Sequence, residues 1–208
     1  MKRQKKSYPE IISADSPDCS QHAAAVIRGG GIVAFPTETY YGLGVNPFDH
    51  EALRRLFEVK KRPRSKAILV IIDTIEQLYL LVSDFPEPFR ALTKQYWPGP
   101  LTLIFPALPG LSKLLTGDTQ TVGIRMSSSK TATGICRACG FPVSATSANI
   151  SGTSPSTCVD DILQYFGSRV DLVIDGGKTA AAQCSTIAAV EDGRVRIIRP
   201  GMVTIQPG

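Results

Sequence analysis

Histidine, on which many hydrolytic enzymes depend, is nearly absent from this chain. The 208 residues include only two histidines, His22 and His50, and neither lies in a polar cluster. A Ser-His-Asp or Cys-His catalytic centre requires a histidine that accepts the proton of the nucleophile. Nothing beside these two residues indicates such a centre, so we expect any chemistry to use charge and substrate positioning instead.

Cysteine is also sparse, and its distribution argues against disulfides. The five cysteines are odd in number and widely spread, which is typical of free thiols in a reducing compartment. Cys136 and Cys139 form a C-x-x-C within a predicted helix, but zinc would need two further thiol or imidazole ligands nearby. We interpret the pair as two small buried side chains, with zinc or redox function as the alternative, and we predict no metal site.

Long apolar runs are missing as well. No stretch approaches the roughly 20 apolar residues of a membrane span, and no apolar signal region follows the basic N-terminus. We therefore expect a cytoplasmic protein without a membrane partner.

Two familiar phosphate-binding loops are also missing. The chain contains no G-x-x-x-x-G-K-[ST], and the "GLG" of residues 42–44 lacks the third glycine of a dinucleotide fingerprint. Any nucleotide site would therefore need another architecture.

The excess positive charge is concentrated at the N-terminus. The net charge is +5, from 23 basic and 18 acidic residues, and four of the basic ones are Lys2, Arg3, Lys5 and Lys6. Without these four, 19 basic residues face 18 acidic ones. We predict a basic tail over residues 1–10 and one domain over residues 11–208. Such a tail favours a polyanion at low salt, and a solvated, disordered terminus is the alternative.

Helical and strand-like patterns alternate along the chain. Residues 49–61 begin with an aspartate and carry apolar residues on one face, which predicts a capped amphipathic helix. The run "AILVII" (67–72) predicts a strand buried on both faces. Near the end, "EDGR" (191–194) places an Asp-Gly turn between two strand-like runs, which is typical of a hairpin. The pattern predicts a single α/β domain around a mixed β-sheet.

Four clusters of polar residues lie at the ends of predicted strands. They are "PTETYYGLG" (36–44), "KKRPRSK" (60–66), "SATSANISG" (144–152) and "DGGK" with "QCSTI" (175–178 and 183–187), and two further strands add Arg125 and Arg199. Hydroxyls, amides near glycine, lysine and arginine together make anion sites, and ligands of α/β sheets bind where strands end. Singly, a cluster could be a solvated helix end or an ordinary polar loop. Together the clusters predict a phosphate or carboxylate ligand.

These motifs, in this order, resemble those of the YrdC-like family of threonylcarbamoyl-AMP synthases over about residues 16–202. The resemblance implies a twisted mixed β-sheet with flanking helices around a basic cavity, in the short single-domain form of the family. It implies that L-threonine, bicarbonate or CO2, and ATP are converted to threonylcarbamoyl-AMP and pyrophosphate, with Mg²⁺ expected. A tRNA threonylcarbamoyltransferase complex would then use the product to modify the adenosine beside the anticodon of tRNA.

The resemblance also implies roles for individual residues. The catalytic signature of the family falls on Lys60, Arg62, Ser147 and Asn149. The contacts to ATP fall on Arg62, Lys66, Thr121, Ser147 and Arg199. The contacts to threonine fall on Thr39, Arg125, Ala145 and Ser185, with Ala145 acting through its backbone.

The sequence departs from the family pattern beside the expected threonine pocket. Ile71 stands where some relatives have histidine, and Cys184 stands where glutamate is common.

Two other functions stay open at this point. One is a double-stranded RNA- or tRNA-binding paralogue with little synthase activity, which would use residues 1–6 and "KKRPRSK". The other is carbamoyl transfer to a protein thiol, as in hydrogenase maturation, which usually comes with fused partner domains.

Overall fold

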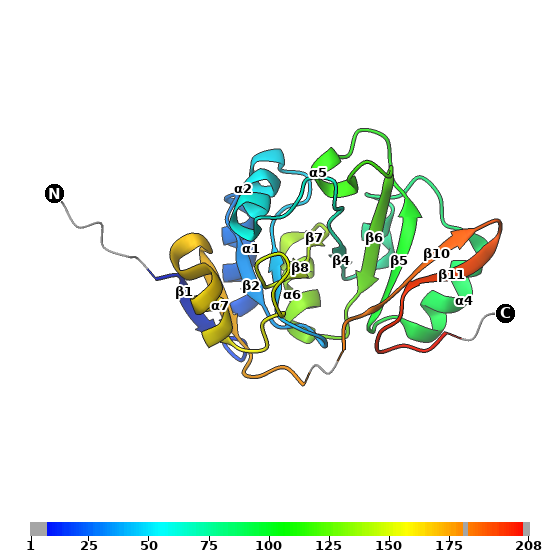
Figure 1. Cartoon of the computed structure of the whole chain (residues 1–208). Helices are drawn as coiled ribbons and strands as arrows, with labels where there is room; N and C mark the ends of the chain where they lie inside the picture. The colour runs from blue at the N-terminus through cyan, green and yellow to red at the C-terminus, as the bar shows by residue number, and fades with distance from the viewer. Residues whose placement is uncertain (1–7, 181–182, 206–208) are drawn as a thin grey trace.

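The computed structural model describes residues 8–180 and 183–205 (Figure 1). Residues 1–7 of the predicted basic tail lie outside the described residues. The last residue of that predicted tail, Glu10, belongs to the first strand, β1 (Glu10–Ser13). No helix in the described ranges is long and apolar enough to cross a membrane.

The described strands form two sheets that lie next to each other (Figure 1). Within residues 8–180 and 183–205, one sheet has five strands, in the order β1, β9 (Leu172–Asp175), β2 (Val33–Phe35), β3 (Gly42–Gly44) and β8 (Thr146–Ser147). Over the same ranges the other has six, in the order β11 (Arg194–Arg199), β10 (Thr186–Glu191), β5 (Leu101–Pro106), β6 (Thr121–Met126), β4 (Val70–Ile72) and β7 (Val143–Ser144).

Both sheets mix strand directions. In the first sheet β1 and β9 are parallel whereas β2 and β3 are antiparallel. In the second sheet β4 and β6 are parallel whereas β5 and β6 are antiparallel. The predicted α/β class with mixed pairing is confirmed, and the structure adds that the strands are divided between two sheets.

The chain passes from one sheet to the other at Ala145, which separates β7 from β8. The Ala145 N–H donates to the carbonyl oxygen of Leu69 at 2.7 Å. Beside it, the Ser144 N–H donates to the Val45 oxygen at 3.1 Å, and the Ser144 hydroxyl accepts from the Val45 N–H at 2.9 Å. These bonds fasten the crossing point, so that both sheets contribute to one site.

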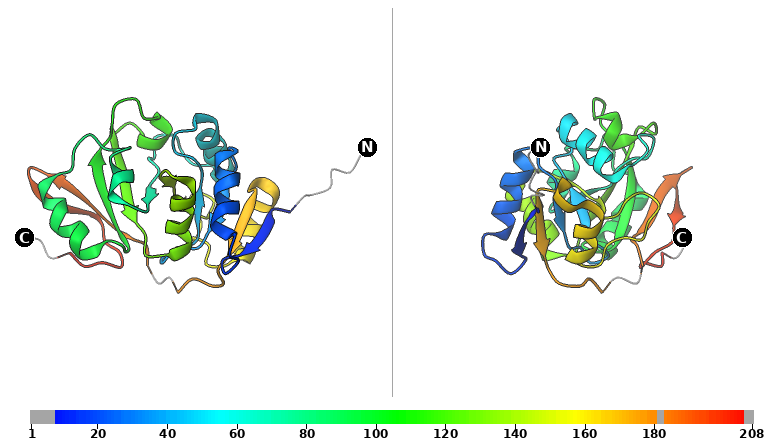
Figure 2. Two further views of the ribbon diagram at one scale, coloured as in Figure 1. Left: turned by 180° about the vertical axis from the view of Figure 1, so that it is seen from behind. Right: turned by 60° about the vertical axis from the view of Figure 1, so that its left-hand side comes forward.

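Helices cover the outer faces of the sheets. Two of them, α1 (Cys19–Arg28) and α6 (Lys130–Cys139), lie side by side (Figure 2) and share a buried apolar cluster with β2 and β9. The other described helices are α2 (His50–Lys60), α3 (Ile75–Leu78), α4 (Glu87–Tyr96), α5 (Lys113–Thr116), α7 (Val159–Phe166) and the short 3-10 turn η1 (Gly167–Arg169). A second, larger apolar cluster fills the space between α2, α4, α7 and the sheets.

Local sequence signals explain several element ends. Asp49 caps α2, because its carboxylate accepts from the N–H groups of Glu51 and Ala52 at 2.9 and 3.0 Å. The turn between β10 and β11 has positive φ at both central residues, 49° at Asp192 and 73° at Gly193, as a tight hairpin turn requires. The predicted capped helix and Asp-Gly hairpin are confirmed.

Other elements differ from the sequence prediction. The strand predicted over residues 67–72 is shorter, because β4 spans only Val70–Ile72 and the preceding residues bond outside the sheet: the Ile68 N–H donates to the oxygen of Leu115, in α5, at 3.0 Å. The run "FPVSAT" (141–146), whose composition favours a single strand, is broken at Ala145 into β7 and β8. Strands β1 and β3 were not predicted, since each is short; β1 pairs with the distant β9, and β3 pairs with the nearby β2 and the distant β8.

Candidate active site

A cavity of about 250 Å³ opens between the two sheets. Its wall takes residues from β3 and β8 of one sheet and from β5, β6 and β10 of the other. Seven of the residues that the sequence predicted for the site line it together: Thr39, Arg62, Arg125, Ala145, Ser147, Ser185 and Arg199. Because they come from segments more than 150 residues apart in the chain, their convergence was not assured by the sequence.

The cavity wall is cationic and rich in hydroxyl groups. Three guanidinium groups line it, those of Arg62, Arg125 and Arg199, and the wall as described contains no aspartate or glutamate. Arginine presents a planar fork of donors that suits carboxylates and phosphates. The cavity therefore has the chemistry of a site for anions.

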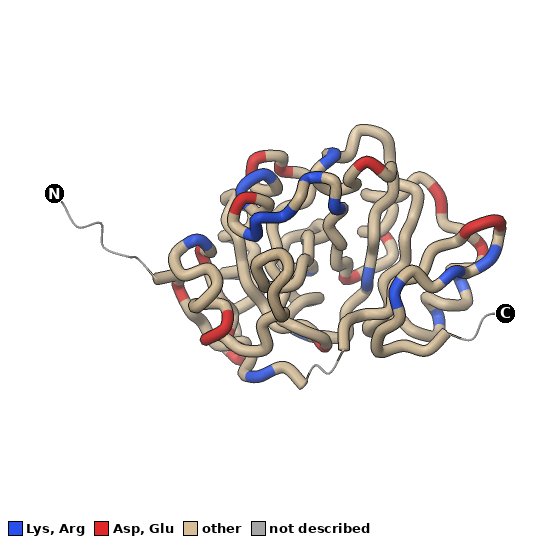
Figure 3. The backbone as a smooth tube through the Cα atoms, in the orientation of Figure 1, with Lys and Arg blue, Asp and Glu red and all other residues tan. Residues whose placement is uncertain are grey.

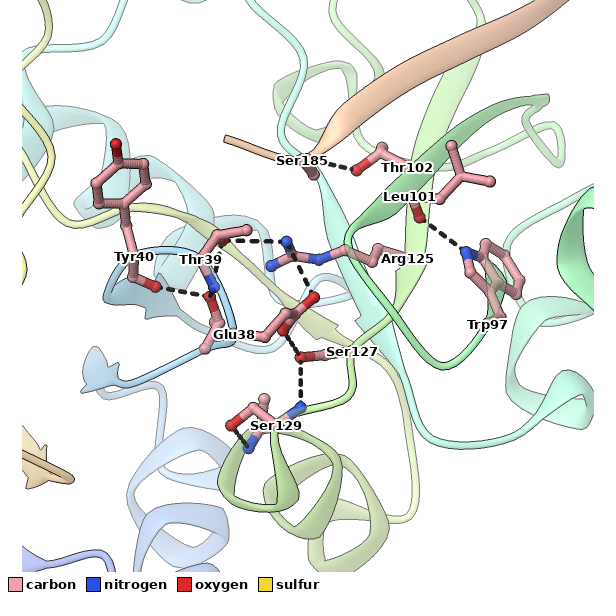
Figure 4. Close-up of polar contacts among 12 residues, drawn as sticks. Glu38, Thr39, Tyr40, Trp97, Leu101, Thr102, Arg125, Ser127, Ser129 and Ser185 are labelled. Atoms are coloured by element: carbon pink, nitrogen blue, oxygen red, sulfur yellow. Dashed lines mark hydrogen bonds and ion pairs between the residues drawn. The ribbon is translucent and has the colours of Figure 1, made fainter. Parts of the chain in front are cut away.

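Arg125, on β6, is the most enclosed of these cations. Its side chain is 6% exposed, and its Nη1 donates to the Thr39 hydroxyl at 3.2 Å and lies 3.4 Å from Glu38 Oε1 (Figure 4). Burial lowers the pKa of Arg125, Glu38 acts in the opposite direction, and the charge of Arg199 adds to the lowering. Among the described residues, Nε of Arg125 and Oε1 of Glu38 are buried without a hydrogen-bond partner. The pair is an ion pair with unused hydrogen-bonding capacity.

The stretch "PTETYYGLG" forms the wall around this pair. The Thr37 hydroxyl donates to the Tyr40 carbonyl at 2.7 Å and accepts from the Thr39 N–H at 3.1 Å, so Thr37 shapes the turn. Thr39 then faces Arg125 across the cavity wall (Figure 4).

Glu38 accepts a hydrogen bond from the Ser127 hydroxyl, which fixes the carboxylate beneath Arg125. A fourth residue, Tyr41, ties this stretch to the 176–177 turn, because its hydroxyl donates to the Gly177 oxygen at 2.7 Å.

Lys60 lies behind the wall and does not line the cavity. Its side chain is almost completely buried, and its ammonium donates to the carbonyl oxygens of Ser147 and Asn149, the latter at 2.8 Å. Its backbone oxygen accepts from the Ser151 N–H at 3.0 Å. Burial lowers the pKa of Lys60 from 10.5 to about 7, with a smaller contribution from the charge of Arg62. Lys60 thus holds the 147–151 loop from both its side chain and its main chain.

The same loop is braced from within. The Ser147 hydroxyl donates to Asn149 Oδ1 at 2.6 Å, and the Asn149 amide donates to the Thr153 oxygen at 2.6 Å. Ser147 lines the cavity, whereas Asn149 is buried behind it. Lys60 and Asn149 therefore support the loop from behind, and Ser147 forms part of the cavity wall.

The remaining predicted nucleotide contacts differ in their placement, because Arg62 lines the cavity whereas Lys66 and Thr121 do not. The Arg62 guanidinium donates to the carbonyl oxygens of Lys66 and Ala67 at 3.1 and 2.5 Å, and burial lowers the pKa of Arg62. Lys66 is exposed, and the Thr121 hydroxyl is 2.8 Å from the Thr119 hydroxyl. Neither Lys66 nor Thr121 belongs to the cavity wall, so their predicted contacts to ATP stay predictions.

On the opposite side of the cavity, Ser185 joins two other wall residues. Its hydroxyl is 2.9 Å from the Thr102 hydroxyl (Figure 4), and Arg199 Nη2 donates to the Ser185 backbone oxygen and hydroxyl at 2.9 and 3.2 Å. Ala145 also lines the cavity. Because its N–H is already bonded to Leu69, a backbone contact from Ala145 to a ligand would have to use its carbonyl oxygen.

Some wall residues were missed by the sequence reasoning. Thr102 and Ile104 stand two residues apart in the run "PLTLIF" (100–105). Their side chains therefore lie on the same face of β5, and both line the cavity. Leu69 also lines it. Ile71, noted for its departure from the family pattern, is fully buried in an apolar cluster and is not part of the wall, although it is paired in register with Arg125.

The cysteine pair lies away from the cavity. Cys136 and Cys139 are both buried against α1, and burial raises the pKa of each thiol, that of Cys139 to about 11. In the parts of the chain that the structure describes, no three His, Cys, Asp or Glu residues gather to hold a metal ion.

Residues 25–201 match the protein family described as "Telomere recombination", Sua5/YciO/YrdC. The chain belongs to the Sua5/YciO/YrdC family. A threonylcarbamoyl-AMP synthase of Pyrococcus abyssi is 38% identical over 184 residues, which are 88% of this chain and 54% of that protein. A threonylcarbamoyl-AMP synthase of Cellvibrio japonicus is 34% identical over 179 residues, 86% of this chain and 94% of that protein.

A solved structure of a family member shows the same fold. The crystal structure of P. abyssi Sua5 complexed with L-threonine superposes with a TM-score of 0.88 at 35% identity, over 94% of this chain and 58% of that one. The chain thus spans little more than half the length of the P. abyssi relative, but nearly the whole length of the C. japonicus relative.

Proposed function

We propose that this protein is an L-threonylcarbamoyladenylate synthase, an enzyme that makes threonylcarbamoyl-AMP and pyrophosphate from L-threonine, bicarbonate or CO2, and ATP. The observation that carries the proposal is the cavity wall, in which three arginines and several hydroxyls meet and no carboxylate is present among the described lining residues. The names of the two synthases and the threonine complex of Sua5 support the same substrates.

In the proposed reaction the amine nitrogen of threonine attacks CO2 and loses a proton, which gives a carbamate. A carbamate oxygen then attacks the α-phosphorus of ATP, the bond from that phosphorus to the bridging oxygen breaks, and pyrophosphate leaves. No side-chain nucleophile is required, in agreement with a cavity wall that contains no histidine among its described residues.

The site would act by holding anions together. Two unit charges 4 Å apart repel by about 4 kcal/mol at an effective dielectric constant of 20, and each charged hydrogen bond offsets about 1.5–3 kcal/mol. Arg125 would hold the threonine carboxylate, since its Nη2 has no acceptor within the described part of the chain. Arg62 and Arg199, with Ser147, would hold the phosphates, and this arrangement would stabilise the charge that develops during phosphoryl transfer.

Lys60 and Asn149 have a different part in this proposal. Both were predicted as catalytic residues, and both lie behind the wall, where they fix the loop that carries Ser147. We assign them to positioning. Lys66 and Thr121 would contact ATP only where the nucleotide extends beyond the cavity wall, to which neither residue belongs.

The described residues do not form a Mg²⁺ site of their own. Magnesium is usually bound by one or two carboxylates together with substrate phosphates. Glu38, which stands between the wall residues Thr37 and Thr39 in the chain, already accepts from Ser127 and faces Arg125. We therefore expect any Mg²⁺ to arrive on ATP, and we assign no protein ligand to it.

The proposal is tested by measuring pyrophosphate release from ATP with bicarbonate present. We expect release to depend on L-threonine and to fall sharply when threonine is omitted or replaced by serine. Tight ATP binding with no threonine-dependent release would refute the proposal. The product is expected to pass to a tRNA threonylcarbamoyltransferase complex.

An RNA-binding role is the second candidate, because basic residues gather along α2 and the segment that follows it (Figure 3). Lys61, Arg64 and Lys66 of this segment are exposed. If RNA is the ligand, binding to double-stranded RNA should weaken linearly on a log–log plot against salt, and deletion of residues 1–6 should reduce the slope. Threonine-dependent turnover with salt-independent, negligible RNA affinity would exclude this role.

A further inference from the structure

The residues after β11 lie across the segment that carries Ser185, and the closest approach is made by Gly201. A Cβ placed on Gly201 would lie 2.6 Å from the Ser185 carbonyl carbon and 2.6 Å from the Thr186 nitrogen, and closer still to the Cys184 oxygen. Carbon atoms in contact normally lie about 3.5–4.0 Å apart. The three nearest atoms are all backbone, so no side chain can move aside to make room.

The conformation of Gly201 does not itself require glycine. Eight described glycines have a positive φ, and Gly201 is not among them. The absence of a side chain is therefore needed for space alone. An alanine at this position would keep an acceptable backbone conformation but would push the 184–186 backbone away.

Hydrogen bonds fasten the two segments on either side of this contact. The Met202 N–H donates to the Cys184 oxygen at 3.0 Å. The Thr186 hydroxyl donates to the Val203 oxygen at 2.6 Å and accepts from the Val203 N–H at 3.0 Å. The position of residues 184–186 is thus set by residues 201–203 together with the pairing of Thr186 with β5.

This contact leads directly to the cavity. Ser185 is buried in the wall, and Arg199, two residues before Gly201, donates to its backbone oxygen and hydroxyl. On its other side the Ser185 hydroxyl meets Thr102 at 2.9 Å. A shift of the 184–186 backbone would break both contacts, because each depends on where the Ser185 backbone lies.

We propose that Gly201 is a positioning residue for the amino-acid side of the site, acting through the Cys184–Thr186 backbone to hold Ser185 against Thr102 and Arg199. The inference rests on the proposed function for the identity of the ligand, L-threonine. Gly201 itself touches no substrate, because it does not belong to the described cavity wall.

The test compares Gly201→Ala with the wild-type protein by calorimetric titration with L-threonine and, separately, with a non-hydrolysable ATP analogue. Both titrations are done at a temperature where circular dichroism shows the variant to be folded. We expect the Kd for threonine to rise at least about tenfold, which is about 1.4 kcal/mol. We expect the Kd for the nucleotide to rise less than the Kd for threonine, because Arg62 and Ser147 are held by other segments and only Arg199, of the three proposed phosphate ligands, contacts Ser185.

Gly29→Ala is the matched control. Gly29 also has a negative φ, −78°, and a Cβ there would meet only ordinary contacts of 3.4 and 3.5 Å at the end of α1. We expect it to bind both ligands as the wild type does. Thr186→Val is a second route to the same effect, since it removes the hydroxyl that holds Val203 without adding bulk at Gly201. It should raise the Kd for threonine in the same direction.

A double-mutant cycle separates positioning from general destabilisation. If Gly201 acts through Ser185, then Gly201→Ala should cost less than about twofold in threonine affinity when Ser185 is already alanine. Additive losses of threonine affinity in the two variants would overturn the inference about Gly201 but not the proposed function. A folded Gly201→Ala variant that binds threonine normally would do the same. A wild-type protein that does not bind threonine would overturn the proposed function, and the ligand named here with it.

Discussion

The buried ammonium of Lys60 makes the stability of this protein depend on pH in a predictable direction. The folded state binds this proton with a pKa of about 7, whereas an exposed lysine has a value of 10.5. Between these two values the unfolded chain holds more protons than the folded one, so the free energy of unfolding increases as pH rises. Below pH 7 both states are protonated and the dependence disappears.

The size of the effect follows from the same two values. The full difference corresponds to about 5 kcal/mol, at 1.36 kcal/mol for each pKa unit. Between pH 7 and pH 9 only part of the titration is crossed, and the expected gain is about 2 kcal/mol. Lys60→Met keeps the length of the chain and removes the titrating group. The free energy of unfolding of the wild type, minus that of the variant, should therefore increase by about 2 kcal/mol over this range.

The measurement is a set of urea unfolding curves at intervals between pH 6.5 and 9, on the wild type, Lys60→Met and the control Lys94→Met. Lys94 is exposed on α4, where methionine and lysine have similar helix propensities. The control should run parallel to the wild type. Parallel curves for Lys60→Met as well would refute the reasoning, because they would show that the carbonyl acceptors keep the ammonium charged through pH 9.

Three further predictions concern single side chains. Arg62→Ala should lower turnover at least about tenfold in a folded protein, since one charged hydrogen bond contributes about 1.5–3 kcal/mol, and near-normal kinetics would contradict its placement on the phosphates. Glu38→Gln should lower the free energy of unfolding by about 3 kcal/mol in urea, because it leaves the buried Arg125 without its counter-charge; an unchanged midpoint would mean that the pair is not coupled. Asp49→Ala should cost about 1 kcal/mol, which is the typical loss of a helix N-cap, and should leave substrate affinity unchanged.

The sequence predicted the elements whose signals are local. The α2 helix has its cap and its apolar face within a dozen residues, and the β10–β11 hairpin has its Asp-Gly turn between two short runs. Strand β1 was missed because its residues are mostly exposed and show no alternation, and its order comes from parallel pairing with β9, about 160 residues away. Signals of that kind depend on the whole fold and cannot be found in a local window.

The candidate site was predicted better as a set than residue by residue. In "KKRPRSK", five cations in seven residues were treated as one cluster. The structure separates them, because α2 ends at Lys60 and Lys61 adopts a left-handed conformation, with φ 51°, that turns the chain. Lys60 consequently points inward, Arg62 lines the cavity and Arg64 is exposed. The helix end, which a charge pattern does not define, decides which cation reaches the site.

The way in which these cations are held explains how the site can be both ordered and attractive to anions. Lys60, Arg62 and Arg199 donate to backbone carbonyl oxygens, and within the described residues none of the three has a carboxylate within 4 Å. Neutral acceptors fix the direction of a cation without cancelling its charge, so the positive potential remains available to a ligand. Arg125 is the exception, since its buried guanidinium faces the carboxylate of Glu38. Arg62 and Arg199, which line the cavity without a carboxylate beside them among the described residues, remain free to pair with the charge of a substrate. Burying the charge of Lys60 lowers the stability of the protein, but the same side chain holds the loop that carries Ser147 into the cavity wall. Such competition between function and stability is common in proteins.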